Sequence, residues 1–156
     1  LGVTTVVLKL FLIAQPDRAY FGQKDAQQAI VIRKMANDLN LPIEIVTCPI
    51  VREEDGLALS SRNTYLSAAE RKSALALPKA LNAGKQMIEK GERDAAAVRK
   101  EILRVLESSP GVRVNYVEVV NGLTLEEMTV LEGKVLLAAA VLVGRTRLID
   151  NIDLEV

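Results

Sequence analysis

The sequence contains no histidine among its 156 residues. Histidine is the commonest general base and the commonest metal ligand in proteins. Any chemistry of this chain must therefore use lysine, arginine, aspartate, serine and backbone groups, or residues outside this sequence. A single cysteine, Cys48, excludes an intrachain disulfide and indicates a reducing, cytoplasmic setting. Because Cys48 falls on a predicted strand, we expect it to be a small core residue.

Long hydrophobic runs and an excess of one charge are also missing. The densest apolar run, 135–143, is far shorter than the roughly 20 residues of a membrane helix. Basic and acidic residues number 20 each, which argues against a nucleic-acid partner. The first residues show no initiator methionine and no leader pattern, so we expect a chain cut from a longer one. About half of the residues, 49%, are hydrophobic, which is enough for a real core.

The first fifty residues predict a helix followed by a strand–helix–strand unit. Asp25 is expected to cap the second helix, whose apolar face is Ala29, Ile32, Ala36 and Leu39. The expected elements are a helix over 3–14, a strand over 19–21, a helix from 25 to about 40 and a strand over 43–48.

A crossover of about twenty residues makes the two strands parallel, because a short hairpin cannot connect them. The loops that follow them, 22–25 and 49–63, then begin at the same carboxyl edge of the sheet. That edge is where open α/β sheets bind ligands.

The remaining residues predict a small α+β part. Ser67 and Glu70 form a capping-box pattern before a long helix that continues to about residue 90, with Pro78 weakening or kinking it. Asp94 is expected to cap a helix over 95–107. We expect strands over 113–120, 134–143 and 145–149, with a helical turn over 124–128. The fold class is therefore α/β: a parallel part over residues 1–50 and a small α+β part over residues 51–156.

One polar cluster follows the first strand. Gly22 leaves the backbone open to a ligand, and the free N–H groups of the next helix suit an anion. Lys24 can neutralise a phosphate, Asp25 can bind a ribose hydroxyl, and Gln28 can donate and accept hydrogen bonds. The alternative is a capped helix with solvated polar residues.

A second polar cluster covers residues 52–63. Ser60, Ser61 and Arg62 offer two hydroxyls and a guanidinium in three residues, a combination that suits phosphate. The alternative is a polar interdomain loop in which Arg62 pairs with Glu53 or Glu54. If both clusters meet at one sheet edge, they favour a nucleotide or phosphate site.

Other candidates are open to simpler interpretations. Residues 53–55 could hold Mg²⁺, although a solvated acidic turn is the alternative. Arg145 and Arg147 could touch phosphate, although their alternation favours the exposed face of a strand. Tyr65 and Tyr116 are expected to pack rather than to stack on a base.

Four segments resemble the pantothenate synthetase (pantoate–β-alanine ligase) family across essentially the whole chain. They are 3–7, 15–28, 51–63 and 143–151. The resemblance implies a Rossmann-like nucleotidyltransferase fold, with residues 1–50 belonging to the nucleotide-binding domain and residues 51–156 forming a small C-terminal lid domain. It also implies ATP-dependent condensation of pantoate with β-alanine through a pantoyl adenylate, with Mg²⁺ accompanying the ATP.

The resemblance assigns roles to the two clusters. Lys24 belongs at phosphate, Asp25 at ribose and Gln28 at pantoate, while Leu59 to Arg62 occupy the place of the superfamily's Lys-Met-Ser-Lys-Ser signature. The implied catalytic residues are Lys24, Ser60, Ser61 and Arg62. The implied ATP-binding residues are Gly22, Lys24, Asp25, Val51, Leu59, Ser60, Ser61 and Arg62.

The family's His-x-Gly-His motif is absent, since the chain has no histidine. We therefore expect this chain alone to be inactive, and the apolar faces at Val6, Leu10, Ile32 and Ile45 to need cover. A homodimer or association through that surface would supply the cover. The alternatives are a non-catalytic nucleotide-binding or interaction module, or an adenylate-forming enzyme that uses another carboxylate.

Overall fold

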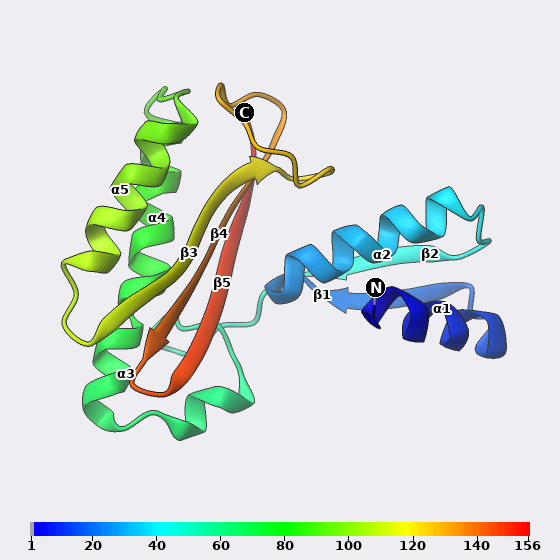
Figure 1. The fold of residues 1–156 in the computed structure, drawn as a ribbon, viewed down its shortest axis with the longest axis horizontal. Coiled ribbons are helices and arrows are strands. Elements are labelled where there is room, and N and C mark those ends of the chain that lie inside the picture. The colour runs from blue at the N-terminus through cyan, green and yellow to red at the C-terminus, as the bar shows by residue number, and fades with distance from the viewer. Residues whose placement is uncertain (1) are drawn as a thin grey trace. The chain divides into compact units, whose positions relative to one another are not determined.

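The computed structural model describes residues 2–156, and the chain divides into two compact units (Figure 1). Unit 1 is residues 1–50 and unit 2 is residues 51–156. Unit 1 contains a two-stranded parallel sheet and unit 2 a three-stranded antiparallel sheet, so the predicted mixed α/β class is confirmed. No helix within residues 2–156 has the length and apolar character to cross a bilayer.

Unit 1 is a helix followed by the predicted strand–helix–strand unit. The strands β1 and β2 pair in parallel from Arg18↔Glu44 to Gly22↔Cys48, which confirms the crossover. The ring of Phe11 meets the ring of Phe21 edge to face at 6.5 Å, and this contact ties the first helix to β1. The elements are α1 (Gly2–Ala14), β1 (Arg18–Gly22), a 3₁₀ turn η1 (Gln23–Asp25), α2 (Ala26–Asp38) and β2 (Glu44–Cys48).

The apolar face of α2 agrees with prediction except at its end. Ala29, Ile32 and Ala36 are buried, but Leu39 is 51% exposed because α2 ends at Asp38. The expectation that Ile32 lacks cover is wrong, since its exposed fraction is 0%. Ile45 is half-buried.

The exposed large apolar side chains of unit 1 lie mainly on α1. Val6 is 59% and Leu10 56% exposed, as expected, and α1 contributes no buried residue. Cys48 is half-buried rather than a core residue, because it ends an edge of a two-stranded sheet.

The expected cap at Asp25 is wrong. Asp25 precedes α2 but makes no side-chain capping hydrogen bond. The chain enters α2 through η1, so the backbone of Asp25 (φ −99°, ψ 52°) is not extended as capping residues typically are.

Unit 2 packs two helices against its sheet, and Figure 1 shows α4 and α5 running side by side. The core alternates along β4, where Val135, Leu137, Ala139, Val141 and Val143 join the helix-facing cluster. The elements are η2 (Ser61–Tyr65), α3 (Ala68–Ala74), α4 (Ala76–Glu89), α5 (Ala95–Glu107), β3 (Val112–Asn121), β4 (Lys134–Val143) and β5 (Thr146–Glu155). The sheet order is β3-β4-β5.

The helix starts in unit 2 follow their predicted caps. Ser67 and Glu70 form the reciprocal capping box, and the Asp94 carboxylate accepts the N–H of Ala96 at 2.9 Å. The single long helix to residue 90 is instead two helices, divided at Leu75. Pro78 explains the break, because it has no N–H to donate to the carbonyl of Ala74.

Two further expectations in unit 2 are wrong. Residues 124–128 form no helical turn, because the Asn121 side chain accepts the N–H groups of Leu123 and Thr124 and closes a different turn. Strand β5 continues to Glu155 rather than ending at residue 149. The polar residues Asp150 and Asn151 suggest a strand end, yet both are buried within it.

Candidate functional site

The first cluster lies where β1 ends and α2 begins. Gly22 is exposed with φ −73° and ψ 133°, and a Cβ built there meets nothing within 4 Å. The backbone at this point is therefore open to approach. Lys24 lies half-buried in η1, and Asp25, the last residue of η1, is exposed. Gln28 is half-buried in the first turn of α2.

A guanidinium that we did not single out from the sequence ties α2 to the sheet of unit 1. Arg33 donates to Thr47 Oγ1 at 2.6 Å and to the Ile45 carbonyl at 3.5 Å. These bonds cross from the helix to β2, so they fix α2 beside the strand whose end begins the next loop. An arginine inside an apolar helix pattern, opposite a threonine on a strand, is the only signal that could have indicated the pair.

The second cluster begins with a chain reversal. The N–H of Leu59 donates to the Val51 carbonyl at 2.9 Å, and that of Glu53 to the Leu57 carbonyl at 2.8 Å. Gly56 closes the turn at φ +91°, a conformation that favours glycine. Val51 and Leu59 consequently lie side by side, and they are 66% and 56% exposed.

The three phosphate candidates follow at the start of η2. Ser60 caps this turn, since its Oγ accepts the N–H of Arg62 at 3.3 Å. Ser61 and Arg62 are exposed, and Ser60 is half-buried. Within residues 2–156 the Arg62 guanidinium forms no salt bridge, so the alternative pairing with Glu53 or Glu54 is wrong. The arrangement exposes the Arg62 and Ser61 side chains, with the half-buried Ser60 hydroxyl beside them.

Glu53 and Asp55 are held by an arginine of α3 instead. Arg71 donates to Glu53 Oε2 at 2.8 Å, and to both carboxylate oxygens of Asp55 at 2.8 Å. The hydrogen bonds from Arg71 lower the pKa of both carboxyl groups, and a further bond from Asn63 lowers that of Glu53. The same pairing raises the pKa of Arg71.

These pairings bear on Mg²⁺. The carboxylates of Glu53 and Asp55 already accept hydrogen bonds from Arg71, and the third acid of this turn, Glu54, is exposed. Between residues 2 and 156 no group of three metal-ligating side chains comes together. The residues present therefore do not fit a preformed Mg²⁺ cage.

An arginine–aspartate pair anchors the start of the loop to the sheet. Arg52 Nη1 lies 2.7 Å from Asp150 Oδ2 and Nη2 lies 3.1 Å from Oδ1, while Nη1 also donates to the Gly56 carbonyl at 3.1 Å. The Asp150 side chain is 1% exposed, so Arg52 rather than water supplies the hydrogen bonds to its carboxylate. The sequence signal that was available is an aspartate two residues from both Leu148 and Ile152, which places it on the apolar face of an alternating strand.

The remaining arginine and tyrosine candidates are structural or exposed. Arg147 is exposed on β5, lies 5.8 Å from the ring centre of Tyr116 and donates to Asn115 Oδ1 at 2.9 Å. Arg145 lies in the turn before β5, not on a strand. Tyr65 is 76% exposed, so the expectation that it packs is wrong, because it ends a surface turn.

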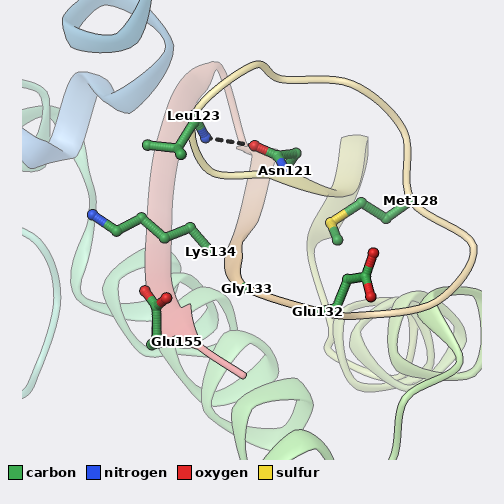
Figure 2. Close-up of a pocket in the computed structure, with 7 residues that line it drawn as sticks. All are labelled: Asn121, Leu123, Met128, Glu132, Gly133, Lys134 and Glu155. Carbon is green, nitrogen blue, oxygen red and sulfur yellow. Dashed lines mark hydrogen bonds between the residues drawn. The ribbon is translucent and has the colours of Figure 1, made fainter.

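A shallow cavity of about 520 Å³ lies elsewhere in unit 2, and Figure 2 shows the residues that line it. Its lining offers one lysine against two glutamates, so its charge does not favour a phosphate. None of the predicted site residues lines it. The lining residues are Asn121, Leu123, Met128, Glu132, Gly133, Lys134 and Glu155.

The cluster at 22–28 belongs to unit 1 and the cluster at 52–63 to unit 2. Their convergence on one ligand stays a prediction, and so do the roles of the individual residues. Each unit nevertheless brings together, within itself, the residues of its own cluster.

Two curated relatives of this chain are both named pantothenate synthetase. A pantothenate synthetase of Caldicellulosiruptor saccharolyticus is 61% identical over 155 residues, covering 99% of this chain and 55% of that protein. One from Acetivibrio thermocellus is 58% identical over 155 residues, with the same coverage of 99% and 55%. The chain thus spans about half the length of the curated relatives it matches.

Solved structures agree. The pantothenate synthetase of Thermus thermophilus superimposes with a TM-score of 0.90 at 44% identity, covering 97% of this chain and 54% of that one. A pantoate-beta-alanine ligase from Francisella tularensis, solved with beta-gamma ATP and beta-alanine, gives a TM-score of 0.63 at 28% identity, with coverages of 97% and 49%. The sequence model of the pantoate-beta-alanine ligase family matches residues 1–153. The chain therefore belongs to the pantoate-beta-alanine ligase family.

Proposed function

We propose that the natural protein carrying this sequence joins pantoate to β-alanine in an ATP-dependent reaction. The pantoate carboxylate attacks the α-phosphate of ATP and pyrophosphate leaves, which forms pantoyl adenylate. The β-alanine amine then attacks the acyl carbon, AMP leaves, and the amine loses a proton. The proposal rests on the family membership and on the two clusters.

The observation that carries the site is the exposed Arg62 beside Ser60 and Ser61. A guanidinium that forms no ion pair with a carboxylate can direct its N–H groups and its positive charge to the departing pyrophosphate. Lys24 would stabilise the same phosphates from unit 1. The Francisella tularensis relative was solved with beta-gamma ATP, which supports the use of a nucleotide.

The other residues would position the substrates. Val51 and Leu59, side by side and exposed, would contact adenine, while Gly22 would admit the nucleotide to the backbone and Asp25 would hold ribose. Gln28 would bind pantoate. We accordingly assign residues 1–50 to the nucleotide-binding domain and residues 51–156 to the lid domain.

Two groups that the family resemblance implies, Mg²⁺ and the imidazoles of a His-x-Gly-His motif, have no counterpart among the described residues of this chain. Mg²⁺ stays a prediction from the resemblance, because residues 2–156 bring no metal-ligating group together, and no step is assigned to it. The chain contains no histidine, so we propose that it does not complete the reaction alone.

Association of unit 1 with further protein is part of the proposal. The exposed apolar residues of α1 would be covered by a second copy, or by the half of a family member that this chain does not match. Gel filtration with light scattering tests this, and a cooperative monomer of the chain alone would contradict it.

The deciding assay for the function is AMP release that requires both pantoate and β-alanine, run on the natural protein and on residues 1–156. We expect activity in the first and none in the second. Turnover by residues 1–156 would show that histidine is dispensable.

The absence of histidine favours one alternative, a non-catalytic nucleotide-binding or interaction module. Titration with ATP, combined with the AMP assay, separates this module from the ligase. A non-catalytic module would bind ATP, but neither the natural protein nor residues 1–156 would produce AMP.

A further inference from the structure

We propose that Arg71 is a positioning residue that, through Glu53 and Asn63, holds Ser60, Ser61 and Arg62 in place for the phosphates. The proposal rests on the proposed function, because it concerns the same phosphate site. Arg71 lies on α3, outside both sequence clusters, and its hydrogen bonds go to Glu53 and Asp55 rather than to the candidate phosphate ligands.

The guanidinium of Arg71 binds two carboxylates of the loop 51–63. Three hydrogen bonds of 2.8 Å run from its Nε and Nη2 to Glu53 and Asp55, and its side chain is 27% exposed. A planar guanidinium spanning two carboxylates fixes direction as well as distance. Glu53 is therefore held in one orientation by a rigid helix.

Glu53 transmits that orientation to the segment. Its Oε2 faces Arg71, and its Oε1 accepts a hydrogen bond of 2.5 Å from the Asn63 amide. The same amide donates to the Ala58 carbonyl at 3.0 Å. Ala58 precedes and Asn63 follows the four residues from Leu59 to Arg62, so one amide group joins both ends of the segment.

Among residues 2–156 the Asn63 side chain forms no hydrogen bond besides those to Glu53 and Ala58. Asn63 is 7% exposed, and among residues 2–156 its Oδ1 has no hydrogen-bond partner. Its amide is thus fixed through Nδ2 alone, by Glu53 and Ala58. Loss of Arg71 would free Glu53 and weaken one of these two bonds.

The segment needs this support because its side chains are solvated. Ser61 and Arg62 are exposed, and long polar side chains on a loop lose conformational entropy when they bind. A segment held in advance binds phosphate with a smaller loss, and a misplacement of about 1 Å in a site can lower a rate about 100-fold.

The test compares three variants in the natural protein. Arg71→Met removes the fork, and Arg71→Lys keeps the charge but not the planar geometry. Arg104→Met is the matched control, because Arg104 makes two hydrogen bonds of 2.7 Å to Glu101 on α5, away from the loop. Hydrogen exchange of the amides of residues 59–65, KM for ATP, KM for β-alanine and kcat are measured for each.

For Arg71→Met we expect amide exchange across residues 59–65 and KM for ATP to rise roughly 10-fold each, with KM for β-alanine unchanged. Arg71→Lys should fall between this variant and the wild type. Arg104→Met should match the wild type in all four readouts.

Two results overturn the proposal. One is unchanged exchange and unchanged KM for ATP in Arg71→Met; the other is a lower kcat and melting temperature with KM for ATP unchanged, which shows a structural role alone. If the wild type releases no AMP, the proposed function fails separately, and the exchange data then decide whether Arg71 orders the segment.

Discussion

The sheets of the two units differ in how they are covered. None of the five residues of β1 or the five of β2 is fully buried, whereas β4 alone buries Val135, Leu137, Ala139, Val141 and Val143 against helices. Parallel strands are normally covered on both faces, and a two-stranded sheet is marginal by itself. Unit 2 carries its own core, whereas we expect unit 1 to need further cover.

The same contrast extends to the candidate site. In unit 2 the loop 51–63 is held by Arg52, Arg71 and Asn63, all through named side-chain bonds. In unit 1 the cluster at 22–28 lies on a strand end and a helix start, and Asp25 makes no capping bond there. The candidate residues of unit 2 are thus held by side-chain bonds across the unit, whereas those of unit 1 are placed by the end of β1 and the start of α2.

The largest effect expected is in the core of unit 2. Ile102, with an exposed fraction of 0%, should cost about 2–5 kcal/mol of unfolding free energy when changed to Ala. Leu10→Ala on α1, where Leu10 is 56% exposed, should stay within about 0.5 kcal/mol when residues 1–156 are measured without the proposed covering protein. Urea unfolding followed by circular dichroism measures both, and equal losses would refute the contrast.

The next effect tests whether both units serve one site. Arg62→Ala in unit 2 and Lys24→Ala in unit 1 should each slow adenylate formation about 100- to 1,000-fold, because each would remove one of the proposed charged phosphate contacts. Isotope exchange between pyrophosphate and ATP measures this step in the natural protein. Lys100→Ala on the exposed face of α5 is the control, and wild-type turnover in either site variant removes that residue from the site.

A pair of glycines sharpens the comparison further. A Cβ at Gly84 would lie 2.8 Å from Ile102, so Gly84→Ala should overpack the core by about 1–3 kcal/mol, less about 1 kcal/mol of helix propensity gained. Gly22→Ala meets nothing within 4 Å, so it should leave the melting temperature unchanged and weaken ATP binding. Calorimetry of melting and of ATP titration checks both, and a stable Gly84→Ala would contradict the packing.

Two helix starts give a smaller effect. Ser67→Ala removes one arm of the capping box and should cost about 1 kcal/mol. Asp25→Ala removes no capping bond, so its stability should match the wild type while ATP affinity falls. Thermal melting compares the two, and a destabilised Asp25→Ala would show a cap that the structure lacks.

The smallest expected effect is acid sensitivity of the loop in unit 2. Folding lowers the pKa of Glu53 from 4.5 and of Asp55 from 3.8, because Arg71 donates hydrogen bonds to both. Below those ordinary values the unfolded chain binds more protons than the folded chain, so stability present at higher pH is lost as the pH falls through the lowered pKa values. Melting temperatures from pH 6 to pH 3 should drop less in Glu53→Gln than in the wild type, and equal slopes would contradict the pairing.

Sequence patterns predicted best where the signal lies within a few residues. The Ser67–Glu70 box, the Asp94 cap and the apolar run of β4 each depend on neighbours along the chain, and each is present in the structure. The parallel pairing of β1 with β2 follows from the length of the crossover. The sequence could not predict that Arg62 forms no ion pair with Glu53, because this depends on Glu53 being hydrogen-bonded to Arg71 instead.

The sequence by itself determined the family, the α/β class and the two polar clusters, since these depend on residue order and local spacing. Only the tertiary structure decided which charges pair. Arg52 and Asp150 are 98 residues apart, and Arg71 lies 18 residues from Glu53. No local pattern encodes such partners, because a buried or forked ion pair forms only after helices and strands have packed and brought distant side chains within hydrogen-bond distance.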